Sequence, residues 1–467
     1  MKKYVVLLVV LPFVGFIAGS LVTNTFENRY IPGNNDISVN AADLPYDNTV
    51  KTGTIKEFDL SASTATIQLN DNDRFETWAY NGQVPGPELR VEKGDTVRIN
   101  FTNNLLVDTT IHFHGIRVPN KMDGVPDVTQ TPIQSGETFT YEFVAHDAGT
   151  FWYHPHVRGN EQVERGLYGT IVVEDPNEPS YSQDKVIVKD DWRILANGKL
   201  DENFNNMHDI GHDGRWGNVI TINGYVLPEM NISSNERVRY RFVNTSNARV
   251  YTLDFGELNA HAIAVDGVLV RDTFDPNGFE LAPGNRLDVD ITAPDSNETF
   301  VIKDRFAGFE NDLFVVHVGE ERVDLQNFEL PQAEKYPDMN ISNYIVDREY
   351  ALDQGGMGMM HNIVATINGQ AYPNYQESSL SKNEFQVIRF SNPSARIHPM
   401  HLHGQFFKVI ARNGVSVDEP FMRDTVLVHG FETVDVGIVP IDGGDWALHC
   451  HILEHAEAGM MTVVEVK

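Results

Sequence analysis

The sequence is poor in cysteine and in basic residues. It has 467 residues and a single cysteine, Cys450, so an intrachain disulfide is excluded and stability must come from burial of a core. Lys and Arg number 36 against 66 Asp and Glu, which gives a formal net charge of -30. Because nucleic-acid binding depends on basic residues that neutralise phosphates, no nucleic-acid partner is expected. We interpret the acidity as favouring solubility.

The N-terminal segment has the pattern of an export signal. Two lysines precede an apolar run from Tyr4 to Val22, and Ala18-Gly19-Ser20 offers small residues for cleavage. We expect residues 1–22 to be a signal peptide or an N-terminal membrane anchor, because a membrane span needs about 20 residues. Either reading predicts an exported protein that is periplasmic, extracellular or tethered to the outer face of the cytoplasmic membrane. No other membrane contact is expected.

An internal repeat divides the rest of the chain into three. Asn81-Gly82, Asn223-Gly224 and Asn368-Gly369 recur at similar intervals, and Asn-Gly is a strong signal of a tight turn between strands. Period-two patterning with frequent Gly and Pro turns predicts β-sandwiches. We therefore expect an all-β protein of three consecutive Greek-key β-sandwich domains. The predicted boundaries are a linker over 23–50 and domains over 51–177, 178–340 and 341–467.

Four H-x-H units carry the chemistry, and one of them contains the cysteine. The two histidines of a unit share one face of a strand, so Cys450 is expected to face away from its two neighbours. His455 and Met460 follow closely, and His398 precedes the third unit, which together give the thiolate, two imidazoles and thioether typical of blue copper. Eight further histidines exceed the four ligands of a zinc site and indicate several metals. The units are His112-Phe113-His114, His154-Pro155-His156, His401-Leu402-His403 and His449-Cys450-His451.

With these four units in order, the chain resembles the multicopper oxidases of the three-domain, laccase-like kind, over nearly the whole sequence after the N-terminal segment. The resemblance implies three cupredoxin-type domains, dioxygen as electron acceptor, and electron flow from Cys450 to its histidine neighbours. It also implies four copper ions: one type 1, one type 2 and two type 3. The implied ligands are His398, Cys450, His455 and Met460 for type 1, His112 and His401 for type 2, and His114, His154, His156, His403, His449 and His451 for type 3.

Two positions bear on proton delivery, which dioxygen reduction requires. Asp123 matches the family's acidic residue beside the type 2 copper, although Asp123-Gly124 is also an ordinary turn sequence. Bacterial members often carry a glutamate directly after the second type 1 histidine, whereas this chain has Ala456 there and Glu457 one residue later. We expect Asp123 to carry more of the proton delivery, or another acid to substitute.

The electron donor is less clearly indicated. The run Gly355-Gly356-Met357-Gly358-Met359-Met360 is similar, in miniature, to the methionine-rich segments of cuprous oxidases, but its composition favours a flexible loop. Arg396, close to His398, would repel a metal cation. We therefore expect a phenolic or other organic small-molecule donor, with cuprous or other metal-ion oxidation in copper tolerance as the alternative.

Two other protein classes share some of these features. Copper nitrite reductases lack a histidine two residues past the His-Cys pair, so His451 argues against that class. A non-catalytic copper-binding protein would need no complete ligand set. The second domain contains no H-x-H unit, so the copper cluster is expected between the first and third domains, with the second as a spacer or as a lining of the substrate entrance. The sequence does not indicate an oligomeric state. Seven histidines without this spacing are interpreted as ordinary: His146, His208, His212, His261, His317, His361 and His429.

Overall fold

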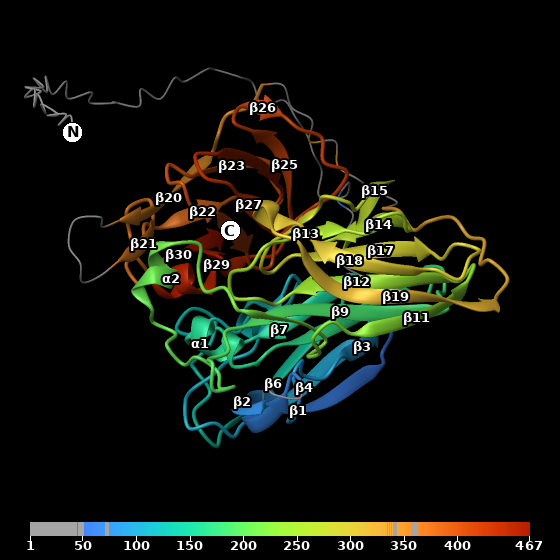
Figure 1. Cartoon of the computed structure of the whole chain (residues 1–467). Coiled ribbons are helices and arrows are strands. Elements are labelled where there is room, and N and C mark those ends of the chain that lie inside the picture. Colours follow the sequence, from blue (N-terminus) through green and yellow to red (C-terminus); the bar gives the residue numbers. More distant parts are fainter. Residues whose placement is uncertain are drawn as a thin grey trace, which may run out of the picture.

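The computed structural model is built almost entirely from β-strands arranged in three successive pairs of sheets (Figure 1). It describes residues 51–70, 74–333, 343–355 and 363–467, together with the single residues Leu44, Lys335, Pro337 and Met339. The predicted signal or anchor (1–22), most of the predicted linker (23–50) and Met357 to Met360 lie outside the described residues. The prediction of an all-β chain of three β-sandwiches is confirmed.

The first sandwich packs two four-stranded sheets around one core. Apolar residues of both sheets meet there, among them Ile99 and Phe101 from one and Phe113 and Phe151 from the other. Strand β4 alternates half-buried and buried residues along its length, as expected for a strand with one face on a core. The sheets have the orders β2-β1-β4-β6 and β3-β8-β7-β5. The strands are β1 (Ile55–Gln68), β2 (Arg74–Tyr80), β3 (Leu89–Glu92), β4 (Thr96–Asn103), β5 (His112–His114), β6 (Thr138–Val144), β7 (Gly149–His154) and β8 (Gly169–Glu174).

The second sandwich has both faces of one sheet buried. Alternate residues of β12, such as Tyr240 and Phe242, enter the core, while arginines on its other face pair with acids, as Arg237 does with Asp290 at 2.8 Å. One sheet contains β9 (Gln183–Trp192), β10 (Val219–Ile222), β12 (Arg237–Asn244), β14 (Asn259–Val265), β15 (Val268–Phe274) and β17 (Arg286–Thr292). The other contains β11 (Glu229–Ser234), β13 (Tyr251–Asp254), β16 (Glu280–Leu281), β18 (Thr299–Asp304) and β19 (Asn311–Arg322).

The third sandwich is formed by the C-terminal part of the chain. Its core includes Met400 and Cys450 from one sheet and Phe390 and Val436 from the other. One sheet contains β20 (Arg348–Gly355), β21 (Val364–Ile367), β23 (Gln386–Ser391), β25 (Phe407–Arg412), β26 (Val415–Ser416) and β28 (Thr433–Ile438). The other contains β22 (Ser378–Leu380), β24 (His398–Leu402), β27 (Thr425–Val428), β29 (Gly444–Cys450) and β30 (Met461–Val466).

The repeated Asn-Gly steps form the same turn in each sandwich, as the sequence predicts. Asn81, Asn223 and Asn368 have φ angles of 52°, 52° and 53°, and each is followed by a glycine with positive φ. Each asparagine side chain also accepts a hydrogen bond of 2.7 Å from a backbone N–H of the sandwich's first long strand. This left-handed conformation suits Asn and Gly, so the repeat in sequence reflects a repeat in backbone geometry.

Among the described residues, helical structure consists of short segments. These are α1 (Gly159–Glu164), α2 (Met207–Gly211), α3 (Leu453–Glu457) and the 3₁₀ turns Asn120–Met122 and Phe306–Gly308. Among the described residues, no helix combines the length and apolar character that a membrane crossing requires. Helix α2 contacts α3, which follows the cysteine-bearing strand β29 in the red C-terminal part of the chain in Figure 1.

Candidate copper centre

Strand pairing brings the four H-x-H units together in two pairs. In the first sandwich, His112 on β5 lies opposite His154 on β7. In the third, His401 on β24 lies opposite His449 on β29, and Met400 lies opposite Cys450. The register therefore sets adjacent units side by side within each sandwich, which sequence spacing alone did not establish.

Histidines of the first and third sandwiches contact each other across the interface between these domains. The rings of His112 and His403 stack with centroids 3.8 Å apart, and those of His114 and His401 stack at 3.7 Å. His449 Nε2 lies 3.1 Å from His403 Nε2 and 3.4 Å from His156 Nε2. Eight histidines from two distant parts of the chain thus form one cluster between the first and third sandwiches.

The cluster has the chemistry of a metal site. Buried nitrogens without a hydrogen-bond partner are costly, and several ring nitrogens here have none. Burial lowers the pKa of seven of these imidazoles, which are therefore neutral and have a lone pair available for a metal: His114, His154, His156, His401, His403, His449 and His451. The unpartnered atoms are His112 Nε2, His114 Nδ1, His154 Nε2, His401 Nε2 and both nitrogens of His451. The pKa is well below the usual value for His114, His154, His156, His403 and His451. These residues fit copper, for which imidazole is a preferred ligand.

A second site surrounds the cysteine on the opposite face of β29. Cys450 Sγ lies 3.6 Å from His398 Nδ1 and 3.7 Å from His455 Nδ1. Met460 is fully buried in the same core, and its carbonyl accepts a hydrogen bond from the Cys450 N–H. Burial raises the pKa of the Cys450 thiol, so a bound cation is needed to hold it as the thiolate. The donor set fits a blue copper ion.

Two aspartates occupy equivalent places in the histidine cluster. The carbonyl of Asp123 accepts from His112 Nδ1 at 2.7 Å, and its carboxylate accepts from His403 Nδ1 at 2.9 Å. The carbonyl of Asp424 accepts from His401 Nδ1 at 2.9 Å, and its carboxylate lies 3.2 Å from His114 Nε2. Asp123 therefore links His112, the first histidine of its unit, to His403, the second histidine of a unit on the third sandwich. Asp424 links His401 to His114 in the corresponding way.

Asp424 was missed by the sequence reasoning, which identified Asp123 alone. It lies between β25 and β27, 23 positions after His401, whereas Asp123 follows His112 by 11. The internal repeat was the available signal, because it predicts that the third sandwich has a counterpart of whatever the first contributes. The difference in spacing concealed that counterpart.

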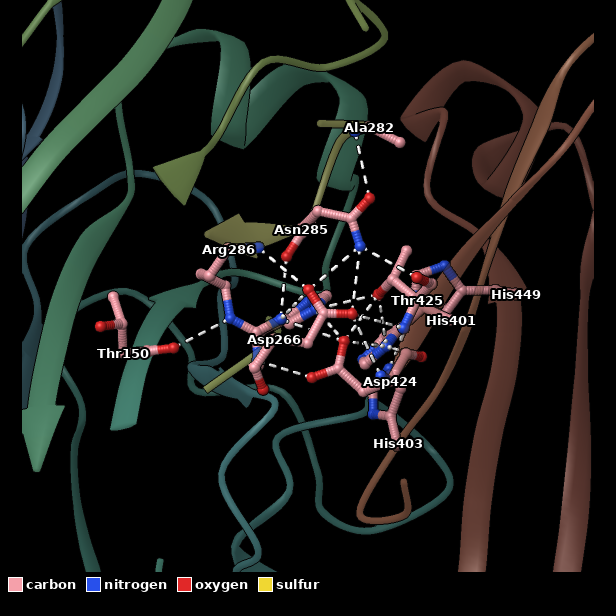
Figure 2. Close-up of polar contacts among 12 residues, drawn as sticks. Thr150, Asp266, Ala282, Asn285, Arg286, His401, His403, Asp424, Thr425 and His449 are labelled. Carbon is pink, nitrogen blue, oxygen red and sulfur yellow. Dashed lines mark hydrogen bonds and ion pairs between the residues drawn. The ribbon is translucent and has the colours of Figure 1, made fainter. Parts of the chain in front are cut away.

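The surroundings of the cluster also differ from the expected spacer role of the second sandwich. Gly284, before β17, lies against the cluster: a Cβ added there would be 2.9 Å from His114 and 3.0 Å from His451. Figure 2 shows Arg286 next to Asp424, close to His401 and His403. The second sandwich therefore contacts the site directly.

The remaining histidines are mostly surface residues, as interpreted from the sequence. His429 pairs with Glu280 at 2.9 Å and His317 with Glu229 at 3.2 Å, while His361 lies outside the described residues. His212 is different, because its carbonyl accepts a 2.7 Å hydrogen bond from His455 Nε2. The chain after α2 thus covers the ring edge of a predicted type 1 ligand.

Comparison with known proteins agrees with this geometry. Three multicopper oxidase family models match residues 61–178, 184–315 and 346–467. The chain is 30% identical to a multicopper oxidase of Staphylococcus haemolyticus over 88% of both chains, and 26% identical to a laccase of Cryptococcus neoformans over 89% of this chain and 80% of that one. A Campylobacter jejuni multicopper oxidase, described as a metallo-oxidase, superposes with a TM-score of 0.77 at 28% identity and covers 90% of this chain and 93% of its own. The chain belongs to the multicopper oxidases, copper-dependent oxidoreductases that use dioxygen.

Proposed function

We propose that the chain is a laccase-like oxidase that couples four one-electron oxidations of a phenolic or other organic donor to the four-electron reduction of dioxygen to water. One observation carries the proposal: Cys450 is bonded through the backbone to His449 and His451, whose rings lie in the other cluster. Copper bound at the two sites supplies one-electron transfer and dioxygen reduction. The peptide that joins them provides the short route between the sites.

We propose the ligand assignment that the family resemblance implies, with four copper ions. His398, Cys450, His455 and Met460 would hold type 1. The type 2 ion would be held by His112 and His401, and the type 3 pair by the remaining six histidines of the four units. The unpartnered nitrogens of the cluster and the two Nδ1 atoms that face Sγ support this assignment.

Asp123 is proposed to handle protons at the cluster. Its carboxylate accepts from His403 Nδ1 at 2.9 Å and lies 3.2 Å from His112 Nδ1. Within the described residues no lysine or arginine pairs with this carboxylate, which supports a role in proton transfer. Glu457 is exposed and Glu454 accepts hydrogen bonds from Arg215 and Asn247, so neither is aimed at the cluster in place of Ala456.

An aromatic surface near His398 supports an organic donor. Trp216 donates from Nε1 to the Asp213 carbonyl, and the Asp213 carboxylate accepts from the N–H of Ile397, the residue before His398. Phe306 and Phe309 pack on Trp216 with ring centroids 5.9 and 6.5 Å away, and Phe309 is 59% exposed. Such a surface suits stacking of an aromatic ring.

Metal-ion oxidation is the second candidate, because two observations favour it. Arg396, expected to repel a metal cation, is paired with Asp213 at 3.4 Å, which offsets its charge. His208 and His212 stack with ring centroids 4.1 Å apart on the segment that covers His455, and the His208 side chain is 72% exposed. Imidazole is a preferred ligand of such ions, so an exposed pair of imidazoles at the end of α2 favours a metal ion.

Measurements of dioxygen uptake by matched variants test whether the electron donor is organic or a metal ion. Uptake would be measured with a substituted phenol and with Cu(I), each with and without added Cu(II). We expect Phe309→Ala to raise the KM for the phenol and His208→Ala to leave it unchanged. If phenols turn over only with added Cu(II), Cu(I) turns over readily and His208→Ala slows it, the metal-ion function is the correct one. If the fully metallated protein contains one copper ion rather than four, both candidate functions are contradicted.

We also propose that residues 1–22 export the protein and that the boundaries 51–177, 178–340 and 341–467 delimit its domains. The grouping of strands into three pairs of sheets supports these boundaries. Release of a shortened chain into the medium or periplasm, detected by N-terminal sequencing, would distinguish a cleaved signal from an anchor.

A further inference from the structure

Arg286 of the second sandwich holds the carboxylate of Asp424 (Figure 2). Its Nη1 and Nη2 donate to the two oxygens of Asp424 at 3.0 and 2.6 Å, which is a two-pronged ion pair. Its Nε donates to the Thr150 carbonyl at 3.0 Å, so one side chain contacts all three sandwiches. Arg286 and Asp424 are both buried, where a planar guanidinium fixes a carboxylate strongly.

Asp266 contacts both Arg286 and Asp424. Its carboxylate accepts from the Arg286 N–H at 3.0 Å, and its carbonyl accepts from Arg286 Nη2 at 2.8 Å. The same carboxylate accepts from the backbone N–H groups of Asp424 and Thr425, at 3.2 and 3.3 Å. Asp266 and Arg286 thus fix both the side chain and the backbone of Asp424.

The first sandwich leaves space for this contact. Gly115, directly after His114, has a φ of +82°, and a Cβ added there would lie 2.0 Å from Arg286 Nη2 and 2.5 Å from Asp424 Oδ2. Any side chain at position 115 would displace the guanidinium from the carboxylate. Gly115, which follows the first histidine unit, therefore leaves the space that Arg286 of the second sandwich occupies.

The orientation of Asp424 decides which ring nitrogens are available for metal. Its carboxylate accepts from His114 Nε2, which leaves the lone pair on Nδ1, and its carbonyl accepts from His401 Nδ1, which leaves the lone pair on Nε2. Those two atoms, His114 Nδ1 and His401 Nε2, are the ones without a partner. Partners of this kind fix the tautomer and ring orientation of metal-binding histidines.

We propose that Arg286 and Asp266 are positioning residues of the copper centre: acting through Asp424, they set the tautomers of His114 and His401, so that the second sandwich is required to assemble the three-copper cluster. This inference rests on the proposed function. The two equivalent aspartates differ in this respect, because a guanidinium holds the carboxylate of Asp424 and, within the described residues, none holds that of Asp123.

The test compares Arg286→Gln with a matched control, Arg237→Gln. Arg237 is an arginine of the same sandwich, paired with Asp290 at 2.8 Å, and it contacts no histidine of the cluster. Each purified holoprotein would be assayed for copper content, for the type 1 and type 2 electron-paramagnetic signals, and for kcat and KM in dioxygen uptake. Loss of a residue that supports metal ligands typically lowers metal affinity or activity by about 10 to 100-fold.

We expect Arg286→Gln to lose type 2 signal and to fall about 10-fold or more in kcat, with KM for the donor and the blue type 1 absorbance retained. Arg237→Gln should keep both copper signals. Arg286→Lys, which keeps the charge but not the planar fork, should fold with a full copper content and an altered type 2 spectrum.

Three results would overturn the inference: wild-type type 2 signal and kcat in Arg286→Gln, equal copper loss in Arg237→Gln, or an insoluble Arg286→Gln together with an Arg286→Lys indistinguishable from wild type. Absence of dioxygen uptake by the wild type and by Arg237→Gln would instead refute the proposed function. In that case copper content and the type 2 signal of the variants still decide the inference.

Discussion

Lys189 provides a sharp test of the energetics of the second sandwich. It lies on β9 with its side chain fully buried, and among the described residues no group accepts a hydrogen bond from its Nζ. The rings of Phe242 and Tyr251 lie beside Nζ, with centroids 4.8 and 5.2 Å from it. Burial lowers the pKa of Lys189 from 10.5 to about 7, against the opposing influence of Asp304. The perturbation is Lys189→Met, which keeps the stem and removes the amine.

The direction of this pKa shift determines how the stability of the wild type changes with pH. Because the folded-state pKa lies below the unfolded value, the unfolded chain binds more protons between pH 7 and 10.5, and the wild type becomes more stable as the pH rises through this window. The buried amine costs about 4 kcal/mol at pH 7 and about 2 kcal/mol at pH 9. Lys189→Met should therefore be more stable than wild type by roughly these amounts.

Guanidinium unfolding of the wild type and of Lys189→Met at pH 7 and pH 9 measures the difference in their free energies of unfolding. Lys408→Met is a suitable control, since Lys408 is also buried but is paired with Asp418 at 2.8 Å, and its removal should destabilise the fold. If Lys189→Met is less stable than wild type at pH 7, or if its advantage is the same at both pH values, the reasoning about the buried amine is wrong.

Four further predictions concern the copper centre. Asp123→Asn should lower kcat about 100-fold or more through lost proton transfer, with the blue absorbance unchanged, and unaltered turnover would remove Asp123 from the mechanism. Cys450→Ser should abolish the blue band and leave the type 2 signal. Gly115→Ala should reduce the type 2 signal, whereas Gly136→Ala, at the same φ of +82° but in open space, should not. Removal of copper by a chelator should lower the melting temperature in calorimetry, because metal binds the folded cluster alone; an unchanged melting temperature would contradict a preformed site.

Much of the architecture was predictable from local sequence. The Asn-Gly steps at 81, 223 and 368 require a left-handed turn that few residues adopt, so a short repeated signal identified three similar sandwiches. The alternation of strand side chains placed Cys450 and His449 on opposite faces, and the structure has them in separate clusters. These features depend on neighbours in the chain, which the sequence displays directly.

The parts that sequence reasoning missed depend on contacts between distant segments. Asp424 and Arg286 each resemble ordinary residues in their own stretch of sequence, and their roles follow from packing three sandwiches around one junction. The same holds for His212, whose backbone carbonyl, not its ring, contacts His455. The sequence by itself determined which side chains are able to bind copper and which face of a strand each occupies, because both follow from residue type and strand period. Only the tertiary structure decided which carboxylates and which sandwich hold those side chains in place, because a buried ion pair forms between residues that the chain brings together at long range.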